Sequence, residues 1–443
     1  MLKAIFISKN LVFCRMKEKI QSVLEKVMEK IMPGKDELAE IAEKCKDFVA
    51  HLRKQAKAKK VNVEIFVGGS FAKGTIIKKE NYDIDIFARF DRKLREKNIS
   101  ELTKKIISGA GDIQEIHGSR NYFRIKSGKN VFIEVVPVLK IKKPEEAENI
   151  TDLSSFHVIY IGKKLQNQKI INDIRLAKAF CHAHNCYGAE SYIRGFSGYG
   201  LELLVYHYKG FLNFIKAAAK MKKGEKIVID IEKHYKSRQQ VLMDINTAKL
   251  SSPIILVDPT YRQRNVLSAL SDETFEKFRA SCIKFLKNPS SSAFEQKKLD
   301  LDSARKSAMA KKHDFIALKA TTGKQEGDIA GTKLAKFYRH LRNELESQFD
   351  IKDSGEEYSG KKTTLYYFSA IPKSEIIKKG PEAKDQKNAN AFRKMHKHVF
   401  IKNKRLYAKE KTRHSVKDFL NKWEQKNKRV LSDMSIKELR VIG

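Results

Sequence analysis

The sequence predicts an α+β protein built from several domains. Its 443 residues are enough for about three domains, each with its own core. Short β-prone segments mix with helix-period segments between residues 36 and 140, and helical periodicity prevails between 172 and 219. Apolar residues make up 41% of the chain, which suits globular folding, and no apolar run approaches the ~20 residues of a membrane span.

The first third predicts a compact domain of helices and strands. Residues 1–15 make a poor signal peptide, because their apolar run is short and no small-residue cleavage site follows. Met16 begins a much better helix pattern, so these residues are interpreted as an N-terminal extension or a misplaced start. Polar residues 144–149 predict a linker at the end of this part. Helices are expected at 36–58 and near 100–108, and strands at 63–67, 83–90, 113–117, 122–126 and 131–140.

Helices predominate in the middle of the chain, and the last third mixes both classes. A helix that begins near Ile174 should end before Tyr187, and a second at 201–218 should be interrupted at Gly210. Another helix is expected within 258–287. Further along, the pattern predicts a loop at 288–294, a helix at 327–348, a strand at 363–371, a turn at 379–381, a helix at 388–397 and a hairpin at 399–407.

Two aspartates in the second predicted strand are the most informative residues. Side chains alternate faces along a strand, so Asp83 and Asp85 point the same way while Ile84 points into a core. Neighbouring carboxylates repel each other unless a cation lies between them, and such oxygen ligands suit Mg²⁺ with a bound triphosphate. A D-x-D pattern alone is common in solvated turns, but the turn that precedes this one favours the metal-binding interpretation.

That preceding turn contains Gly68, Gly69 and Ser70. Glycines let backbone N–H groups and a hydroxyl approach phosphate oxygens closely. A phosphate cradle followed by a carboxylate pair is the layout that nucleotidyl transfer needs. Glu134, inside an apolar predicted strand, is the candidate third carboxylate, because an acid there is costly to bury without a partner. The alternative is an edge-strand residue that faces water.

Charge and cysteine content indicate the partner and the compartment. Ninety Lys plus Arg against 53 Asp plus Glu give a net charge of +37, spread along the chain. This excess favours a polyanionic partner, above all nucleic acid, although solubility alone could also explain it. Five scattered cysteines argue against a disulfide framework and for a reducing cytoplasm. The Cys181–Cys186 segment is a poor zinc site, because its Cys and His residues spread around a helix axis.

The chain resembles the DNA polymerase β-like nucleotidyltransferase superfamily in its Gly-Ser turn and aspartate pair. Residues 193–204 read Ile-Arg-Gly-Phe-Ser-Gly-Tyr-Gly-Leu-Glu-Leu-Leu, which is similar to the R-G-F-S-G-Y-x-x-E-L-L run of archaeal, class I CCA-adding enzymes. Val-Asp-Pro at 257–259, Arg-Asn-Val at 264–266 and Arg-Leu-Tyr-Ala at 405–408 also match that family. The resemblance runs from about Met16 to the C-terminus.

This resemblance implies an architecture and a reaction. It predicts a catalytic head at 16–148, a helical neck at 149–257, and a mixed α/β body and tail at 258–443 that bind the tRNA acceptor arm. It implies template-independent addition of C, C and A to the 3′ end of tRNA from CTP and ATP, with release of pyrophosphate. It implies no membrane association, and it is compatible with a homodimer.

The resemblance also implies roles for particular residues. Asp83, Asp85 and Glu134 would hold two Mg²⁺ ions for a two-metal transfer. The family usually has Glu-x-Asp at the first pair and Asp in the third position, so these exchanges of one methylene leave the coordination geometry open. The implied nucleotide-binding residues are Gly69, Ser70, Lys73, Ser154, His157, Lys178, Tyr187 and Arg264.

Within that set, Gly69 and Ser70 would hold the terminal phosphates, with Lys73 where relatives often carry Arg. Ser154 and His157 would line the sugar and triphosphate side, and Lys178 and Tyr187 would hold the triphosphate. Those last two could instead be a solvated helix lysine and a core tyrosine. Arg264 would read the base together with tRNA phosphates, whereas Asn265 is interpreted as structural.

Two other functions compete with CCA addition. The first is a related RNA 3′-nucleotidyltransferase, such as a poly(A) polymerase or an enzyme that adds only A. The second is a non-catalytic RNA-binding protein on a degenerate head. The three acids and the intact Gly69-Ser70 pair argue against the second, because a decayed site would have lost some of them.

Overall fold

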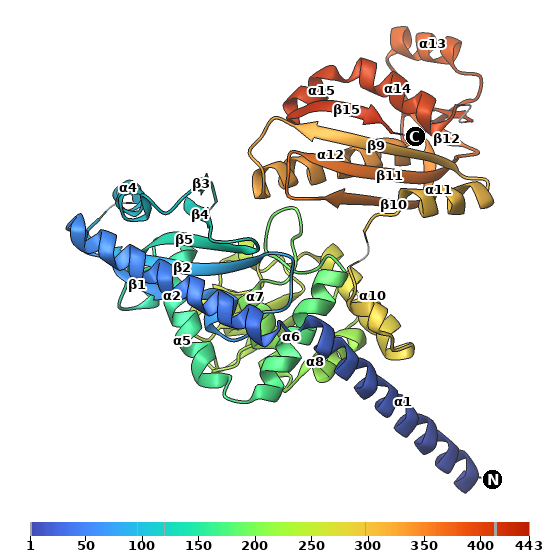
Figure 1. Ribbon diagram of the computed structural model, residues 1–443. Coiled ribbons are helices and arrows are strands. Elements are labelled where there is room, and N and C mark those ends of the chain that lie inside the picture. The colour runs from blue at the N-terminus through green and yellow to red at the C-terminus, as the bar shows by residue number, and fades with distance from the viewer. Residues whose placement is uncertain (1, 95, 119, 297, 412–413, 443) are drawn as a thin grey trace. The chain divides into compact units, whose positions relative to one another are not determined.

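The computed structural model describes residues 2–94, 96–118, 120–296, 298–411 and 414–442, with side chains left out of the description at 2–14, 96 and 97. The chain divides into two compact units, Met1–Gln296 and Lys297–Gly443, coloured blue to yellow and yellow to red in Figure 1. The predicted boundary after residue 257 falls inside the first unit, so the four-part division stays a prediction. Among the helices of the described ranges, none is long and apolar enough to cross a bilayer.

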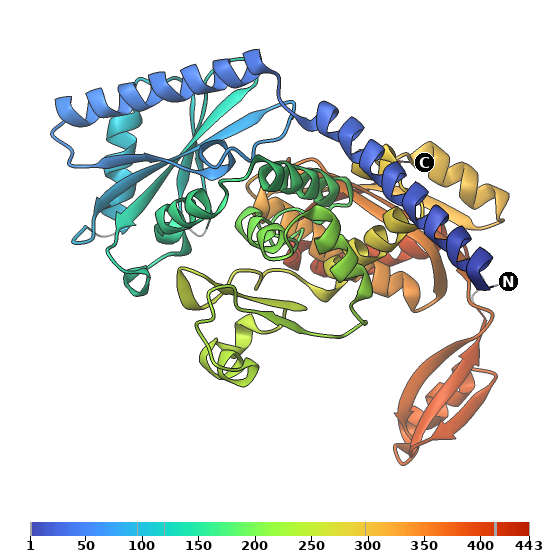
Figure 2. The same cartoon turned by 90° about the horizontal axis from the view of Figure 1, so that it is seen from below.

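The first unit opens with two long helices, α1 (Leu2–Ile31) and α2 (Lys35–Ala58). The predicted extension continues without a break into α1, whose buried Leu24 packs in the same core as the middle of the unit. Helix α2 begins and ends as the sequence predicts. Its buried face, which includes Leu52, packs on the sheet that follows (Figure 2).

That sheet has five strands in the order β1-β2-β5-β4-β3. Neighbouring strands are antiparallel except β2 and β5, which run parallel. Helices α2 and α4 (Glu96–Ile107) pack in one core with the apolar face of the sheet, and α4 begins earlier than predicted. The strands confirm the predicted segments closely: β1 (Glu64–Val67), β2 (Tyr82–Asp91), β3 (Ile113–Ile116), β4 (Tyr122–Lys126) and β5 (Val131–Lys140).

The middle of the unit is a helical layer with a small sheet. The predicted linker is partly ordered as the 3-10 turns η1 (Pro144–Glu146) and η2 (Ile150–Leu153). The predicted break at Gly210 is confirmed, because it separates α7 from α8. The helices are α5 (Ser154–Lys164), α6 (Gln168–Ala183), α7 (Gly198–His207), α8 (Phe211–Lys220), α9 (Arg238–Asp244) and α10 (Asp272–Lys287).

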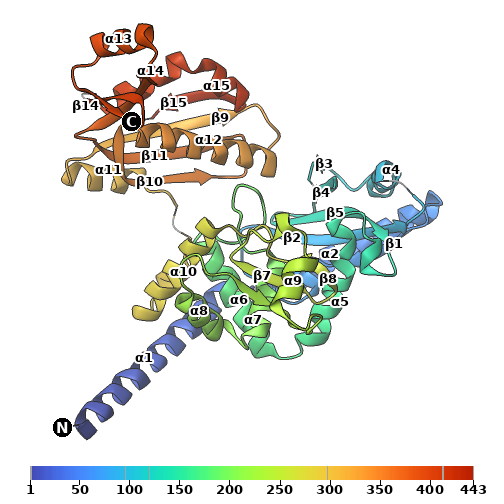
Figure 3. The same cartoon turned by 180° about the vertical axis from the view of Figure 1, so that it is seen from behind.

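Three features of this layer were not predicted. They are helix α5, helix α9 and a three-stranded sheet of β6 (Ile227–Ile229), β7 (Ile254–Asp258) and β8 (Tyr261–Asn265), labelled in part in Figure 3. Every residue of β7 is buried, and a short, wholly buried strand shows no alternation that periodicity could detect. The expected loop at 288–294 contains the 3-10 turn η4 (Ser291–Phe294).

The second unit is built on an antiparallel sheet in the order β10-β11-β9-β15. Helices α12 and α14 pack together against it, and Trp423 of α14 lies 6.2 Å from Phe337 of α12 between ring centroids. The elements are α11 (Leu301–Ala310), β9 (Asp314–Thr322), α12 (Asp328–Glu346), β10 (Phe349–Tyr358), β11 (Thr363–Pro372), α14 (Val416–Lys426), α15 (Lys428–Asp433) and β15 (Ile436–Val441).

A second, three-stranded sheet corrects one prediction. The expected turn at 379–381 is wrong, because these residues lie inside β12 (Ile376–Glu382), which pairs with β14 (Arg405–Glu410). The pairing register shifts between Lys379 and Glu382, so the glycine and the proline form an irregularity in a strand. Helix α13 (Gln386–Met395) and the hairpin of β13 (Val399–Lys402) and β14 confirm the remaining predictions.

An aromatic cluster stabilises the helical layer of the first unit. Phe278 of α10 is 1% exposed, and its ring centroid lies 4.8 Å from that of Phe196 and 5.3 Å from that of Phe214. Phe180 of α6 joins them at 5.8 Å. The cluster therefore ties three helices, α6, α8 and α10, into one core.

We expect Phe278→Ala to lower the free energy of unfolding of the first unit by about 3–5 kcal/mol, because it removes buried ring contacts and leaves a cavity. Urea denaturation followed by circular dichroism measures this. Ile283→Ala on the same helix is the matched control, because Ile283 is 43% exposed and should change stability by no more than about 0.5 kcal/mol. Equal losses in both variants would contradict the assignment of Phe278 to the core.

Candidate active site

Three acids lie on one face of the five-stranded sheet. Asp83 and Asp85 are partly buried and alternate with the fully buried Ile84 and Ile86 along β2. Glu134 of β5 is the parallel register partner of Asp85. Because the isoleucines pack in the core that contains α2, the acids face the other side of the sheet. The predicted shared direction of the two aspartates and the neighbouring third acid are both seen in this arrangement.

These acids line a cavity of about 360 Å³ within the first unit. The cavity brings together residues from the sheet, from the loop after β1 and from helices α6 and α7. Ser154, His157 and Arg264, which the sequence also singled out, are not among the side chains that line it. The predicted residues that do line it are Gly69, Ser70, Lys73, Asp83, Asp85, Glu134, Lys178 and Tyr187.

The acids repel one another and are poorly compensated. Burial, and then the nearby charge of Asp83, raise the pKa of Asp85 to about 6. Burial, and then Asp85 and Asp83, raise the pKa of Glu134 to about 8. Arg124 of β4 contacts two of them: it donates from Nη2 to Asp83 Oδ1 at 2.9 Å, and its Nε lies 3.7 Å from Glu134 Oε1.

The donor set fits a divalent cation in charge and in chemistry. Carboxylate oxygens are the ligands that Mg²⁺ prefers, and a cation would relieve the repulsion that raises the two pKa values. Within the described part of the chain, no three acidic, histidine or cysteine side chains are gathered around a single ion position. Asp83 is instead turned toward Arg124. The fit therefore rests on charge and donor type, and not on preformed coordination.

The loop after β1 makes its close approach through a glycine. Gly69 has φ +64°, and a Cβ atom placed there would lie 1.6 Å from Asp85 Oδ2. The predicted tight turn is a single helical turn, α3 (Gly69–Ala72), anchored by the Gly68 N–H, which donates to the Asp85 carbonyl at 2.9 Å. Only glycine therefore fits between the loop and the aspartate.

The positive side of the cavity is organised by a residue whose role the sequence did not predict. Glu202 of α7 is fully buried and lines the cavity. Its Oε2 accepts from Lys73 Nζ at 2.6 Å, and its Oε1 accepts from Lys178 Nζ at 3.1 Å and from the Thr75 hydroxyl at 2.9 Å. The signal was available, because an acid inside the apolar run Gly-Leu-Glu-Leu-Leu is costly to bury without partners.

The pKa values of Glu202 and Lys178 are both shifted by their surroundings. Burial works against the Glu202 carboxylate, but the charges of Lys73 and Lys178 outweigh it and lower the pKa of Glu202 to about 2. Burial lowers the pKa of Lys178 to about 8 in spite of Glu202. Tyr187 completes this side of the cavity, and the ring of His182 lies 4.2 Å from the Tyr187 ring between centroids.

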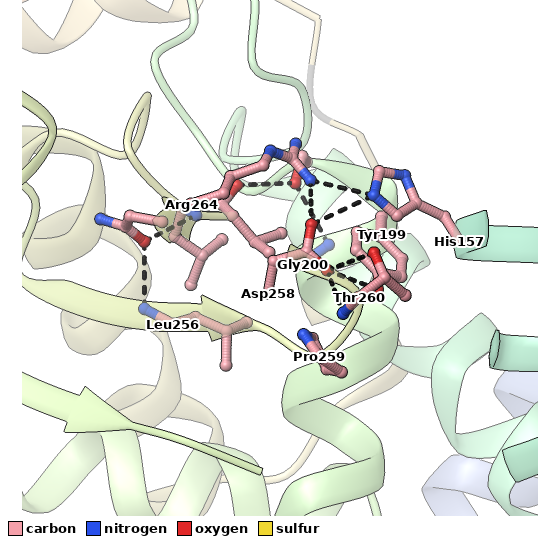
Figure 4. A network of polar contacts seen from close by, with 12 residues as sticks. His157, Tyr199, Gly200, Leu256, Asp258, Pro259, Thr260 and Arg264 are labelled. Atoms are coloured by element: carbon pink, nitrogen blue, oxygen red, sulfur yellow. Dashed lines mark hydrogen bonds and ion pairs between the residues drawn. The ribbon is translucent and has the colours of Figure 1, made fainter. Parts of the chain in front are cut away.

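His157 and Arg264 belong to a separate polar cluster around Asp258 (Figure 4). Asp258 is fully buried, and its Oδ2 lies 2.6 Å from Arg264 Nη1 and 3.1 Å from His157 Nε2. Tyr199 donates its hydroxyl to Asp258 Oδ1 at 3.2 Å and stacks on His157 with ring centroids 4.0 Å apart. Burial lowers the pKa of His157, whereas His157 and Arg264 hold the pKa of Asp258 well below its usual range despite its burial.

The remaining predicted residues have clear positions. Ser154 is the first residue of α5, directly after η2. The Asn265 side chain accepts from the N–H groups of Leu256 and Leu267, each at 3.0 Å, and donates to the Lys249 carbonyl at 2.8 Å. The structural role predicted for Asn265 is confirmed. The role of Asp258 was not predicted, because this residue was identified only as part of the Val-Asp-Pro segment that resembles the family.

We expect Gly69→Ala to weaken the binding of Mg²⁺·ATP by about tenfold or more, because the added methyl group overlaps the Asp85 carboxylate. Gly74→Ala is the matched control: its φ is +65°, and nothing lies within 4 Å of the added Cβ atom. Backbone strain is therefore similar in both variants. Isothermal calorimetry compares them, and equal affinities would contradict the close approach at Gly69.

Glu134→Gln should stabilise the metal-free protein at pH 8. The pKa of Glu134 rises from 4.5 to about 8 on folding, so the stability from its proton is full below pH 4.5 and is lost as the pH rises through 8. Removing the charge should restore roughly 1–3 kcal/mol at pH 8 and nothing at pH 4. Calorimetric Tm values in EDTA measure this effect.

The same measurement has two internal checks. Added Mg²⁺ should raise the Tm of the wild type more than that of Glu134→Gln, because a bound ion stabilises the folded state. Glu64→Gln should give the opposite sign in EDTA, since Lys140 and then Arg89 lower the pKa of Glu64 by pairing with its carboxylate. A lower Tm for Glu134→Gln than for the wild type at pH 8 in EDTA would disprove the predicted repulsion.

Known proteins match the two parts of the first unit. The family described as "tRNA nucleotidyltransferase, second domain" matches residues 172–295, and the "Second Messenger Oligonucleotide or Dinucleotide Synthetase domain" matches residues 18–156. A solved structure of Cid1, described as having RNA terminal uridylyl transferase activity, superposes with a TM-score of 0.50 at 14% identity. It covers 64% of this chain and 100% of its own, and it shows the polymerase β-like fold alone.

Full-length relatives extend the match to the second unit. The CCA-adding enzyme of Methanocaldococcus jannaschii is 28% identical over 406 residues, which are 88% of this chain and 87% of that enzyme. The CCA-adding enzyme of Nanoarchaeum equitans is 34% identical over 319 residues, which are 72% of this chain and 75% of that enzyme. At this identity and coverage the relationship is one of family, and the chain belongs to the archaeal CCA-adding enzymes, as a tRNA nucleotidyltransferase.

Proposed function

We propose that this enzyme adds C, C and A in turn to the 3′ end of tRNA, using CTP and ATP and releasing pyrophosphate at each step. The observation that supports this most directly is one cavity that joins the three carboxylates of the sheet to Lys73, Lys178 and a glycine turn. Nucleotidyl transfer needs both halves: acids for metal-assisted attack by a hydroxyl, and cations for the triphosphate. Family membership supplies the identity of the primer.

In this proposal Asp83, Asp85 and Glu134 hold two Mg²⁺ ions. Bound magnesium would lower the pKa of the primer 3′-hydroxyl and neutralise the charge that develops on the leaving pyrophosphate. The protein residues fix where this happens. Asp85 and Glu134 lie on adjacent parallel strands, so their relative position is set by sheet hydrogen bonds and not by a flexible loop. Arg124, on the neighbouring strand β4, would orient Asp83 through the hydrogen bond between them.

The nucleotide would lie between the glycine turn and helices α6 and α7. Ser70, Lys73, Lys178 and Tyr187 face the same cavity and would contact the triphosphate. Arg264, held by Asp258, would read the base. Cytosine and adenine share an amino group next to a ring-nitrogen acceptor, and a planar fork of donors suits that acceptor edge.

His157 and Tyr199 help to hold Arg264 in the position from which it would recognise the base. Tyr199 donates to Asp258, and His157 stacks on the Tyr199 ring, so the carboxylate that holds Arg264 is fixed on its other sides. Ser154, at the start of α5 three residues before His157, would contact the sugar side of the nucleotide. These assignments follow the family pattern, and the geometry of the Asp258 cluster supports them.

We further propose that residues of the second unit bind the tRNA acceptor arm and that the enzyme acts in the cytoplasm. A net charge of +37 suits a partner with many phosphates. The four cysteines that are described, Cys45, Cys181, Cys186 and Cys282, are free and buried, which agrees with a reducing compartment.

The test offers the purified enzyme a tRNA that ends before CCA. We expect three added residues with CTP and ATP together, two with CTP alone, and none with GTP or UTP. Gel analysis of labelled product counts them. Long A tails, or addition of A without C, would favour a poly(A) polymerase or an enzyme that adds only A.

Asp85→Asn should reduce transfer by about a thousandfold or more while tRNA binding stays close to wild type, because the carboxylates serve the chemistry. Asp91→Asn is the matched control: Asp91 ends the same strand, β2, and is exposed. Single-turnover rates and filter-binding affinities give both readouts. A near-normal rate for Asp85→Asn would remove Asp85 from the mechanism.

A further inference from the structure

Glu202 links two parts of the first unit that are distant in sequence. It lies on α7, and Lys73 and Thr75 lie 129 and 127 residues before it in the loop that follows β1. Lys178 comes from a third element, α6, and also donates to the Thr75 hydroxyl at 2.7 Å. One carboxylate therefore connects α6, α7 and the loop that carries the proposed phosphate-binding turn.

Both lysines are removed from solvent at this point. The side chain of Lys73 is 9% exposed and that of Lys178 is 3% exposed, while the Glu202 side chain has no exposed area. A buried ammonium group without a partner is strongly unfavourable, and two of them close together are more so. The carboxylate compensates both, and its hydrogen bonds fix where the two ammonium groups lie at the cavity wall.

A second contact from α6 holds the same loop. Arg175 donates to the carbonyl of Gly74 at 2.7 Å and to that of Ile76 at 3.1 Å. These bonds flank Thr75, so the backbone on each side of it is anchored to α6. The loop that carries Lys73 is thus fixed before any nucleotide arrives, which lowers the ordering entropy lost on binding.

We propose that Glu202 is a positioning residue for the nucleotide triphosphate: it holds Lys73 and Lys178 with their ammonium groups at the cavity wall, ready to bind phosphate oxygens. This inference rests on the proposed function, because it assumes that the cavity binds a nucleoside triphosphate. Glu202 itself makes no contact with substrate in this scheme. It acts through the two lysines.

Positioning and overall charge predict opposite changes in nucleotide affinity when the Glu202 carboxylate is removed. Deleting a negative charge beside a site for a polyanion should tighten binding if overall charge were decisive. If positioning is decisive, loss of the carboxylate leaves two buried ammonium groups without their common acceptor. Lys178 then loses its proton more easily or changes its rotamer, and binding weakens. The sign of the effect therefore separates the two explanations.

Glu202→Gln is the first test, because it keeps the shape of the side chain. Affinity for Mg²⁺·ATP, measured by isothermal calorimetry, and the KM for CTP should both weaken by about 10- to 100-fold. The kcat and the affinity for tRNA should change little, whereas the Tm should fall because two buried ammonium groups lose their common acceptor. Glu232→Gln is the matched control: Glu232, like Glu202, accepts from a hydroxyl group and pairs with a lysine, here Tyr160 and Lys164, but it is more exposed.

A double-mutant cycle checks that Glu202 acts through Lys178. Lys178→Met and Glu202→Gln should each weaken nucleotide binding, and the loss in the double variant should be smaller than the sum of the two single losses, because only the effect through Lys73 then remains. Additive losses would contradict action through Lys178. Glu202→Asp keeps the charge at shorter reach and should recover part of the affinity, and it replaces Glu202→Gln in the cycle if that variant does not fold.

The outcomes distinguish this inference from the proposed function. Unchanged or tighter nucleotide binding by folded Glu202→Gln overturns the inference, and so does a parallel fall in tRNA affinity and kcat, which would indicate a structural role only. If the wild type binds Mg²⁺·ATP but adds no CCA, the proposed function fails, whereas weaker binding by Glu202→Gln would still support the inference.

Discussion

The parallel pairing of β2 with β5 is the constraint on which the rest of the site depends. It places Asp85 next to Glu134 in register, with Asp83 two residues away on the same face. Sheet hydrogen bonds fix this arrangement, so the carboxylates cannot move apart to relieve their repulsion. Burial first, and this repulsion second, raise the pKa values of Asp85 and Glu134. The other parts of the cavity can be understood as compensation for this fixed concentration of negative charge.

The compensation comes from outside the sheet. Lys73 belongs to the loop after β1, but the carboxylate that holds it is on α7, and Lys178 is on α6. The sheet alone therefore supplies the acids but not an ordered set of cations for a triphosphate. The site therefore needs the sheet and the helical layer together, and both lie in one compact unit. The aromatic core packs α6, which carries Lys178, against α8 and α10.

The sequence predicted the local features of this site and missed those that depend on distant contacts. Asp83, Asp85 and Gly69 were identified because alternation along a strand and the steric freedom of glycine are local properties. The parallel register, and the roles of Glu202 and Asp258, were not predicted. Glu202 and Lys73 are separated by 129 residues, and the periodicity of one segment does not indicate which distant segment it contacts. Strand β7 was missed because burial on both faces removes the alternation that marks a strand.

The two charged clusters of the first unit follow the same physical rule. In each, a fully buried carboxylate accepts from a cation on another element: Glu202 from two lysines, and Asp258 from Arg264, with His157 as a further hydrogen-bond partner. A buried anion that is paired in this way is costly to disturb, because removing it leaves its cations uncompensated. In the sheet, Asp83 and Glu134 share one partner, Arg124, and burial followed by mutual repulsion raises the pKa values of Asp85 and Glu134. Compensation is therefore complete where side chains must stay fixed and incomplete where a metal ion would complete it, so the distribution of unpaired charge marks where the chemistry takes place.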